Sequence, residues 1–145
     1  MKVYLAGSIA GGREYENSIQ IISDILEDMG HTIITKDNVV KNNDKTKSKK
    51  LLSVRKYIVK RDLNWLKNSD LFIAEVSTYS HGVGYEHRCA EEFKKPILLL
   101  RHKSLSKEAY SAFLDGHSYD KFNFSFYDRN NIREVLEEFI KKYER

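Results

Sequence analysis

The stretch Leu71-Phe-Ile-Ala-Glu-Val-Ser-Thr-Tyr-Ser-His-Gly-Val-Gly-Tyr-Glu86 decides the fold. Its first six residues, Leu71 to Val76, form an almost continuous apolar run, which is typical of a strand buried on both faces. A polar turn with two glycines follows, and a helix is predicted over Gly84 to Lys95. A buried strand that passes into a helix in this way predicts a parallel α/β unit.

Strands and helices alternate on both sides of this stretch. The other predicted strands are Lys2–Ala6, His31–Thr35, Pro96–Leu100 and Lys121–Tyr127. The other predicted helices are one from about Ile19 that stops at Gly30, then Ser53–Asn68, Ser106–Leu114 and Asn130–Tyr143. Five strands joined by helices predict an α/β three-layer sandwich with a five-stranded parallel sheet, flavodoxin-like or Rossmann-like. In a flavodoxin-like strand order, ligands bind beyond the C-terminal ends of the first and third strands.

Length and composition indicate a single domain over residues 1–145, because 41% hydrophobic residues suffice for one core. Residues 37–50 lack large apolar side chains almost completely and predict a mobile loop. The single cysteine cannot form an internal disulfide, and the start does not resemble a signal peptide, so we expect a cytoplasmic protein. The apolar runs are much shorter than the roughly 20 residues of a membrane span, so no membrane partner is expected.

The net charge of +4 comes largely from Lys41 to Lys60. It suits a small anionic substrate, because positive potential raises the encounter rate of an anion. Binding of a nucleic acid through Lys45 to Lys60 is an alternative, although no nucleic-acid partner is expected.

A glycine-rich turn follows the first strand, Gly7-Ser-Ile-Ala-Gly-Gly-Arg-Glu14. It leads into a helix whose free N–H groups favour an anion. Arg13 and Glu14 stand where a P-loop needs Lys and Ser/Thr, and the G-x-G-x-x-G spacing of dinucleotide sites is absent. The turn therefore indicates neither an NTP hydrolase nor a dinucleotide site, and a tight turn without a ligand is the alternative.

Two acidic residues are candidates for chemistry. Glu86 is predicted in the first turn of its helix, where the helix dipole favours the ionised form that a carboxylate nucleophile requires, although it could be only a favourable first-turn acid. Asp62 lies on the apolar stripe of the Ser53–Asn68 helix, where a carboxylate needs a partner, and a purely structural pairing with Arg61 or Arg13 is the alternative. Two carboxylates that meet at one sugar are the arrangement that glycosyl transfer uses.

Other reactive residue types give no such pattern. The five histidines show no ligand spacing and there is one cysteine, so we expect no metal and no cofactor. Cys89 is expected to pack inside its helix. Phe122, Phe124 and Phe126 alternate as strand residues do, which indicates core packing and not a base-stacking platform.

Six motifs, taken in order, resemble the 2′-deoxynucleoside 5′-phosphate N-hydrolase family of the nucleoside 2-deoxyribosyltransferase superfamily. They are VYLAGSIAGGRE (3–14), RDLNWLKNSD (61–70), LFIAEV (71–76), GVGYE (82–86), KKPILLL (94–100) and YSAFLDG (110–116). The resemblance spans almost the whole chain and implies a flavodoxin-like fold in a homodimer or larger oligomer. It also implies hydrolysis of 2′-deoxynucleoside 5′-monophosphates to free base and 2-deoxyribose 5-phosphate.

Matched by position, the resemblance implies three catalytic residues. Glu86 would be the nucleophile that forms a glycosyl-enzyme ester, which water later opens. Asp62 would contact the sugar and assist proton movement, and Tyr4 would face the sugar.

The resemblance also implies substrate-binding residues, namely Gly7, Ser8, Ile9, Gly12, Ser80, Gly82 and Ser111. Ser80 and Gly82 match the turn that binds the 5′-phosphate, and Ser111 matches a serine that reaches into the neighbouring subunit's site. Two departures leave the base preference open: Ala10 replaces an arginine, and Thr35 to Val39 lacks a histidine.

Three alternatives stay open. A deoxyribosyltransferase would use the same glycosyl-enzyme but pass the sugar to a second base. A ribonucleotide N-glycosidase of the CMP type would accept a 2′-hydroxyl, which Tyr4 disfavours sterically. A nucleotide-binding module is the non-enzymatic alternative, although Ala6-Gly7-Ser8 lacks the acidic cluster of a receiver domain.

Overall fold

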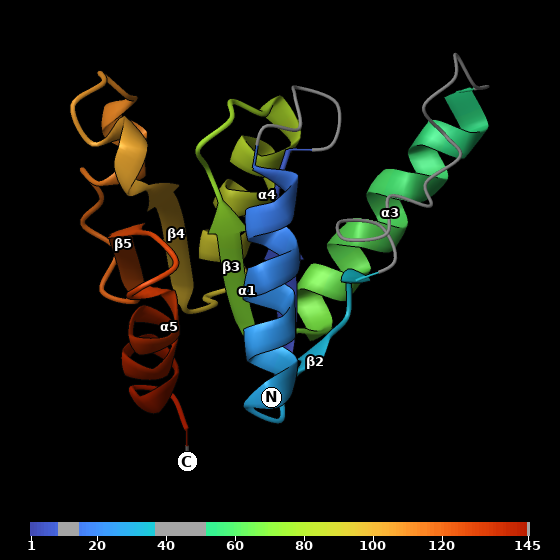
Figure 1. The fold of residues 1–145 in the computed structure, drawn as a ribbon. Helices are drawn as coiled ribbons and strands as arrows, with labels where there is room; N and C mark the ends of the chain where they lie inside the picture. The colour runs from blue at the N-terminus through green and yellow to red at the C-terminus, as the bar shows by residue number, and fades with distance from the viewer. Residues whose placement is uncertain (9–14, 37–51, 145) are drawn as a thin grey trace.

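The computed structural model describes residues 1–8, 15–36 and 52–144 of the 145-residue chain (Figure 1). Its five strands are β1 (Lys2–Ala6), β2 (Thr32–Ile33), β3 (Leu71–Glu75), β4 (Ile97–His102) and β5 (Phe122–Tyr127). All neighbouring strands pair in parallel, in the order β2-β1-β3-β4-β5. The predicted five-stranded parallel sheet and its flavodoxin-like order are therefore confirmed.

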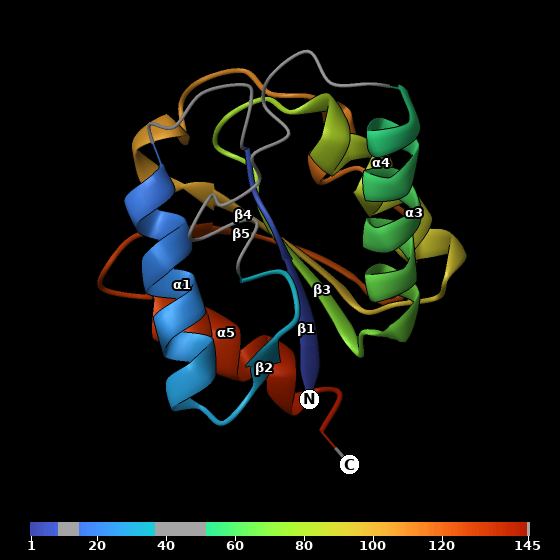
Figure 2. The same ribbon diagram turned by 90° about the vertical axis from the view of Figure 1, so that its right-hand side faces the viewer.

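Helices cover both faces of the sheet. Figure 2 shows α1 (Glu16–Asp28) and α5 (Ile132–Lys141) on one face, with α3 (Leu52–Asn68) and α4 (His81–Glu92) on the other. The predicted three-layer sandwich is thus confirmed. None of the helices in the described part of the chain has the length and apolar character needed to cross a membrane.

Alternation along the strands divides the core between the two faces. Val3 and Leu5 of β1 pack toward α1 and α5, whereas Tyr4 packs toward α3 and α4. Phe122 and Phe124 of β5 pack against the Tyr4 side of the core, as their spacing predicts, and Cys89 is buried within α4. Tyr4 is therefore placed by the pleat of β1 beneath the two helices that carry Asp62 and Glu86.

The ends of α1 and α4 follow from local chemistry. Gly30 has φ +85° just after α1, a left-handed conformation that glycine adopts without strain, and it stops the helix as predicted. At α4, the Ser80 hydroxyl accepts a hydrogen bond from the Val83 backbone N–H at 3.3 Å. This cap starts α4 at His81, three residues before the predicted start.

Two predicted elements are corrected. The strand predicted over His31–Thr35 is only Thr32–Ile33, because the Thr35 hydroxyl bonds both the N–H and the carbonyl of Leu5 in place of further strand pairing. The prediction of a helix over Ser106–Leu114 is wrong. Two short 3₁₀ turns stand near it, Lys103–Leu105 and Ala112–Leu114, and no side chain between 103 and 118 is buried. A helix without a buried stripe has little packing to stabilise it.

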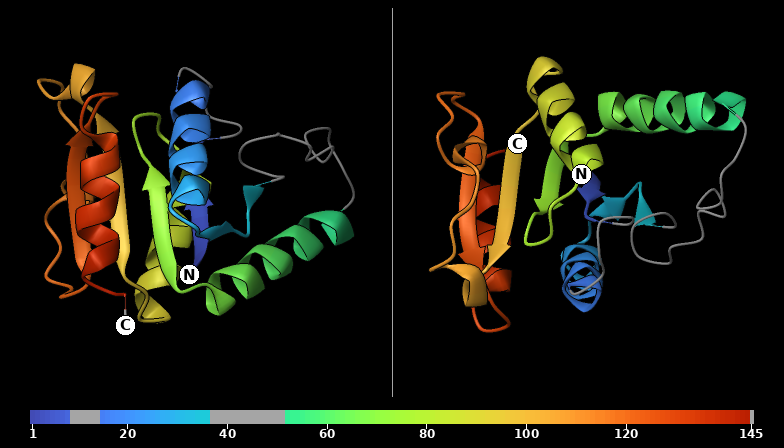
Figure 3. Two further views of the ribbon diagram at one scale, coloured as in Figure 1. Left: turned by 60° about the horizontal axis from the view of Figure 1, so that its bottom comes forward. Right: turned by 90° about the horizontal axis from the view of Figure 1, so that it is seen from above.

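Helix α3 is buried less than its stripe predicts. Leu66 is buried, whereas Val54, Ile58 and Trp65 are only half-buried. Figure 3 shows the N-terminal part of α3 extending away from the sheet. The loop predicted over residues 37–50 lies outside the described residues.

Candidate active site

Tyr4 and Glu86 meet at the carboxyl-terminal side of the sheet. Tyr4 comes from β1 and is 2% exposed, and Glu86 comes from α4 and is half-buried. The Tyr4 hydroxyl donates a hydrogen bond to Oε1 of Glu86 at 2.6 Å. This distance is typical of a short, charge-assisted bond from a hydroxyl to a carboxylate.

Asp62 of α3 is the third member of the group. Nε and Nη2 of Arg61 each lie 2.8 Å from Oδ1 of Asp62, so the predicted structural pairing with Arg61 is present. The Arg61 guanidinium also stacks on the Trp65 ring, 4.6 Å from its centroid. The charge of Asp62 nevertheless raises the pKa of Tyr4 and of Glu86, which places it within electrostatic reach of both.

Glu86 titrates near neutral pH. Burial raises its pKa from the ordinary 4.5 to about 7, the charge of Asp62 adds to the rise, and the bond from Tyr4 opposes it. Near pH 7, Glu86 thus exists in both its ionised and its protonated form. A carboxylate poised at this pH can act as a nucleophile and can also exchange protons.

This finding corrects the expected role of the helix dipole. Because α4 starts at His81, Glu86 lies in the second turn and not the first. The dipole acts mainly within the first turn, so burial and not the helix end dominates the pKa of Glu86.

Tyr4 remains a neutral hydrogen-bond donor. Burial raises the pKa of its phenol far above the ordinary value of 10, and the negative charge of Glu86 raises it further. Because the phenol keeps its proton, it can stabilise the ionised form of Glu86.

Ser80 and Ser111 line one cavity of about 100 Å³, together with Val76, Thr78, Tyr79, Val83, Gly84, His87, Leu99 and Leu114. Both serine Oγ atoms accept a backbone N–H, Ser80 from Val83 and Ser111 from Phe113. Each hydroxyl can therefore still donate its own hydrogen to a ligand. The structure brings these two predicted phosphate contacts together within a single chain.

The two glycines of the GVGYE motif were expected in the turn before the helix, but they belong to the helix itself. Gly82 and Gly84 lie inside the first turn of α4 and make no sharp turn. A Cβ atom on Gly84 would meet nothing within 4 Å, and one on Gly82 would lie 3.8 Å from Ser80 Oγ. Their effect is to leave the N-terminal turn of α4 open to a ligand.

The glycine-rich turn is described only in part. Gly7 and Ser8 follow β1 directly, and Ser8 Oγ is buried without a hydrogen-bond partner in the described structure. Such a hydroxyl is available to a ligand. Ile9 and Gly12, the other predicted contacts from this turn, lie outside the described residues.

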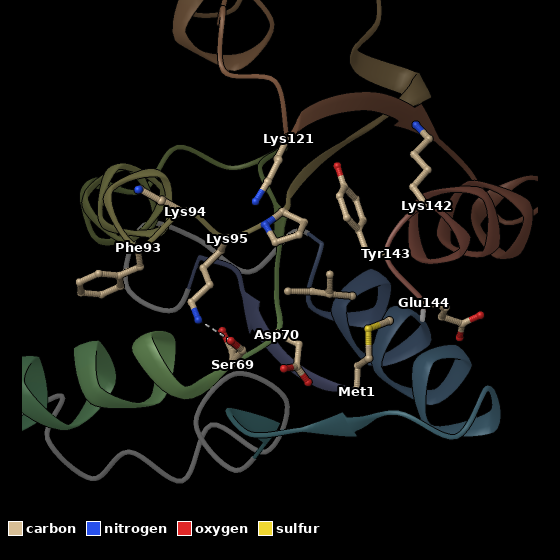
Figure 4. A pocket seen from close by; sticks show the side chains of 12 residues that line it. Met1, Ser69, Asp70, Phe93, Lys94, Lys95, Lys121, Lys142, Tyr143 and Glu144 are labelled. Atoms are coloured by element: carbon tan, nitrogen blue, oxygen red, sulfur yellow. Dashed lines mark hydrogen bonds between the residues drawn. The ribbon is translucent and has the colours of Figure 1, made fainter.

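A wider hollow of about 790 Å³ lies at the opposite, amino-terminal edge of the strands (Figure 4). Lys94, Lys95, Lys121 and Lys142 line it with the carboxylates of Asp70 and Glu144. Lys95 Nζ donates to the carbonyls of Lys67 and Ser69 at 2.7 and 2.6 Å, which ties the end of α3 to α4. The hollow contains none of the predicted site residues.

Metal ligands do not cluster in the described structure. No group of three His, Cys, Asp or Glu side chains within residues 1–8, 15–36 and 52–144 is arranged to hold a metal ion. The rings of His87 and His117 do pack together, with centroids 4.8 Å apart, although they are distant in sequence.

Comparison with known proteins decides the family. The family model described as nucleoside 2-deoxyribosyltransferase matches residues 3–126. The chain belongs to the nucleoside 2-deoxyribosyltransferase family. This confirms the resemblance inferred from the ordered motifs.

Two relatives are similar over almost the whole of this chain. A 5-hydroxymethyl-dUMP N-hydrolase of Tetraodon nigroviridis is 32% identical over 140 residues, which cover 97% of each chain. A protein of Methanosarcina mazei, assigned to the 2′-deoxynucleoside 5′-phosphate N-hydrolases, is 33% identical over 96% of this chain and 83% of its own.

Two solved structures share the fold. A CMP N-glycosidase of Clostridium botulinum superposes with a TM-score of 0.63 at 23% identity, covering 94% of this chain and 99% of its own. A 2-deoxyribosyltransferase of Bacillus psychrosaccharolyticus gives a TM-score of 0.66 at 17% identity, covering 94% and 90%. At these identities, the likeness shows the nucleoside 2-deoxyribosyltransferase fold alone.

Two buried charged residues could not be recognised from the sequence pattern. Glu75, at the end of β3, accepts hydrogen bonds from the hydroxyls of Ser77 and Tyr127. Arg101, near the end of β4, is 1% exposed. The available signal was a charged residue at the end of an apolar strand, which by itself does not tell an inward side chain from an outward one.

Proposed function

We propose that this protein hydrolyses the N-glycosidic bond of a 2′-deoxynucleoside 5′-monophosphate, releasing the free base and 2-deoxyribose 5-phosphate. The observation that carries the proposal is the 2.6 Å hydrogen bond between Tyr4 and Glu86 within reach of the charge of Asp62. The protein is an enzyme that cleaves N-glycosidic bonds, because relatives named N-hydrolases match 96–97% of its length.

Glu86 is the nucleophile of the proposed reaction. Its carboxylate attacks C1′, the C1′–N bond breaks, and the electron pair leaves with the base, which takes up a proton from solvent. Water then attacks C1′ and passes a proton through the Asp62 carboxylate to solvent, while the ester C1′–O bond breaks and returns Glu86 to its ionised form. Two inversions at C1′ give overall retention of configuration.

Asp62 and Tyr4 assist this reaction in different ways. The transition state carries positive charge on the sugar, and the carboxylates of Asp62 and Glu86 stabilise that charge in a partly buried site. Asp62 also contacts the sugar and moves protons. Tyr4 holds Glu86 in place and favours its ionised form through the hydrogen bond.

The 5′-phosphate binds where α4 begins. Ser80 offers a hydroxyl donor beside the cavity, and the first helical turn at Gly82 offers backbone N–H groups. Ser111 of the neighbouring subunit adds a second hydroxyl donor. A helix N-terminus favours an anion through these N–H groups and through its dipole. Gly7 and Ser8 contact the substrate in this proposal.

The functional unit is a homodimer in which each chain contributes Ser111 to the neighbouring subunit's site. Ser111 is exposed, and the Phe113 side chain beside it is 77% exposed. Further large apolar side chains are exposed on α3 and α4, namely Leu52, Tyr57, Val59 and Tyr85. Exposed apolar surface of this kind often marks a contact between chains.

The proposal is tested by chromatography of released base. The protein is incubated with the four 2′-deoxynucleoside monophosphates, their ribo counterparts and the free deoxynucleosides. Release from deoxy monophosphates alone supports the proposal and names the base. Release from CMP alone would point to a ribonucleotide N-glycosidase, and release that requires an added acceptor base would point to a deoxyribosyltransferase.

A further inference from the structure

Arg101 is a buried cation with two unpartnered hydrogen-bond donors. Its side chain is 1% exposed, and its Nε and Nη1 atoms are buried with no hydrogen-bond partner in the described structure. An isolated buried charge is costly to the folded state, and a buried donor without a partner often marks the place of a ligand. The proposed roles of Glu86, Asp62 and Tyr4 do not involve this arginine.

Arg101 lies beside the cavity that holds Ser80 and Ser111. Alternation along β4 places its side chain on the same sheet face as Leu99, which lines that cavity. Val76 also lines the cavity, and its backbone N–H bonds the carbonyl of Leu100 at 2.8 Å, so Val76 lies next to Arg101 across the sheet. The unpartnered guanidinium thus borders the proposed phosphate site.

Tyr110, the residue before Ser111, covers the guanidinium. The Arg101 Cζ atom lies 5.1 Å from the centre of the Tyr110 ring. A tyrosine face attracts a cation but offers Nε and Nη1 no hydrogen-bond acceptor of ordinary strength. The Tyr110 ring therefore leaves Nε and Nη1 of Arg101 able to donate hydrogen bonds to a ligand.

Glu75 is a buried carboxylate whose charge reaches Arg101, but it does not bond the guanidinium. It lies on the other face of the sheet, where Ser77 and Tyr127 donate to it. Burial raises its pKa, and the charge of Arg101 partly opposes that rise. Glu75 thus leaves the Nε and Nη1 donors of Arg101 unpaired.

The cover over Arg101 is held mainly by ring contacts. Tyr110 stacks on Phe124 and meets Phe126 edge-on, with ring centroids 5.6 and 6.0 Å apart. No side chain from 103 to 118 is buried, and the Tyr110 hydroxyl is held by one exposed hydrogen bond to Asp115, at 2.9 Å. The carbonyl of Ala109 accepts a further long bond from Tyr79, at 3.4 Å. An anion that bonds the buried Arg101 donors requires Tyr110 to shift on the Phe124 and Phe126 rings, which exposes part of their apolar surface.

We propose that Arg101 binds the phosphoryl group of the substrate, next to Ser80. This inference rests on the proposed function. It adds a full positive charge to a phosphate site that otherwise has only hydroxyl groups and the N-terminus of α4. Arginine suits this part because its planar fork bonds two phosphate oxygens at once. Arg101 would then select nucleotides over nucleosides.

The test measures phosphate binding and phosphate selectivity separately. Inorganic phosphate is titrated calorimetrically into the parent protein and into Arg101→Met, Arg101→Lys and Arg88→Met. The last is the matched control, because Arg88 is exposed on α4 and pairs only with Glu91 and Glu92 in the described structure. The same proteins are assayed on a deoxynucleoside monophosphate and on its unphosphorylated deoxynucleoside.

Arg101→Met is expected to weaken phosphate binding and to lower the nucleotide-to-nucleoside ratio of kcat/KM by at least about tenfold, and Arg88→Met is expected to change neither. Arg101→Lys keeps the charge but loses the fork, so phosphate binding should weaken by about tenfold. If Arg101→Met does not fold, the phosphate affinity of Arg101→Lys tests the inference by itself. Parental phosphate affinity and selectivity in the folded variants would overturn the inference.

The two proposals can fail separately. If the parent hydrolyses a deoxynucleotide while Arg101→Met keeps parental selectivity, the role of Arg101 is wrong and the proposed function stands. If the parent hydrolyses no nucleotide but binds phosphate only with Arg101 present, the anion site stands and the proposed substrate is wrong.

Discussion

The Tyr4 hydroxyl lies 2.6 Å from Oε1 of Glu86 and joins two residues that are 82 positions apart in the chain. This bond ties the central strand β1 to helix α4. It also acts on the charge of Glu86, since it lowers a pKa that burial raises to about 7. Tyr4 therefore lowers the pKa of Glu86 and Asp62 raises it, and the two effects can be measured separately.

Tyr4→Phe removes the bond that favours the ionised carboxylate. The pKa of Glu86 is expected to rise, so the acid limb of kcat/KM moves to higher pH and activity at pH 7 falls by about tenfold. Assays of base release between pH 5 and 9 measure this shift. Tyr57→Phe, at an exposed tyrosine of α3, is the control. An acid limb that stays in place would show that the bond does not tune Glu86.

Asp62→Asn removes a negative charge near Glu86. The pKa of Glu86 is expected to fall, which moves the acid limb of kcat/KM to lower pH, opposite to Tyr4→Phe. Because Asp62 also assists the chemistry, kcat should drop by about a hundredfold or more with a much smaller change in KM. An unchanged kcat would remove Asp62 from the catalytic group.

Glu86 also makes stability depend on pH. Its pKa is higher in the folded protein, about 7, than the ordinary 4.5, so ionisation is less favourable in the folded state. This penalty is absent below pH 4.5, grows as pH rises to 7, and is constant above. Glu86→Gln lacks the penalty, so its Tm should rise relative to the parent across that interval.

Thermal unfolding at half-unit pH steps measures the difference in Tm between Glu86→Gln and the parent. Glu138→Gln, an exposed glutamate of α5, is the control and should show no such trend. A difference that stays constant from pH 4.5 to 7.5 would mean that the pKa of Glu86 is not raised.

Shared sites in the proposed homodimer are tested by complementation. Glu86→Gln and Ser111→Ala subunits are each expected to be inactive or nearly so. If Ser111 serves the neighbouring site, unfolding and refolding an equal mixture should restore about a quarter of the parental activity, because half of the dimers then contain one intact site. If Ser111 serves its own chain, the mixture should gain nothing.

Much of the site could be predicted from the sequence because the fold is periodic. Apolar runs separated by helices imply a parallel sheet, and such a sheet brings the ends of β1 and β3 together. Tyr4 and Glu86 lie near these ends, and Asp62 stands on the helix before β3. Their convergence thus follows from topology and the ordered motifs, without knowledge of any contact.

The errors come from interactions between residues that pattern does not reveal. The Ser80 hydroxyl caps α4 early, which moves Glu86 out of the first turn. The segment around Ser106 has residues that favour a helix but no face to bury, so only short turns form. The side of the sheet on which Arg101 lies depends on the register of β4 with its neighbour β5. The sequence alone does not give this register.

Base release from a 2′-deoxynucleoside 5′-monophosphate by the parent protein and by Glu86→Gln tests the central claim most directly. Glu91→Gln, one turn further along α4, is the matched control. The account predicts release by the parent and by Glu91→Gln, and a loss of at least about a thousandfold in a Glu86→Gln protein that stays folded. Release by folded Glu86→Gln at the parental rate would contradict it.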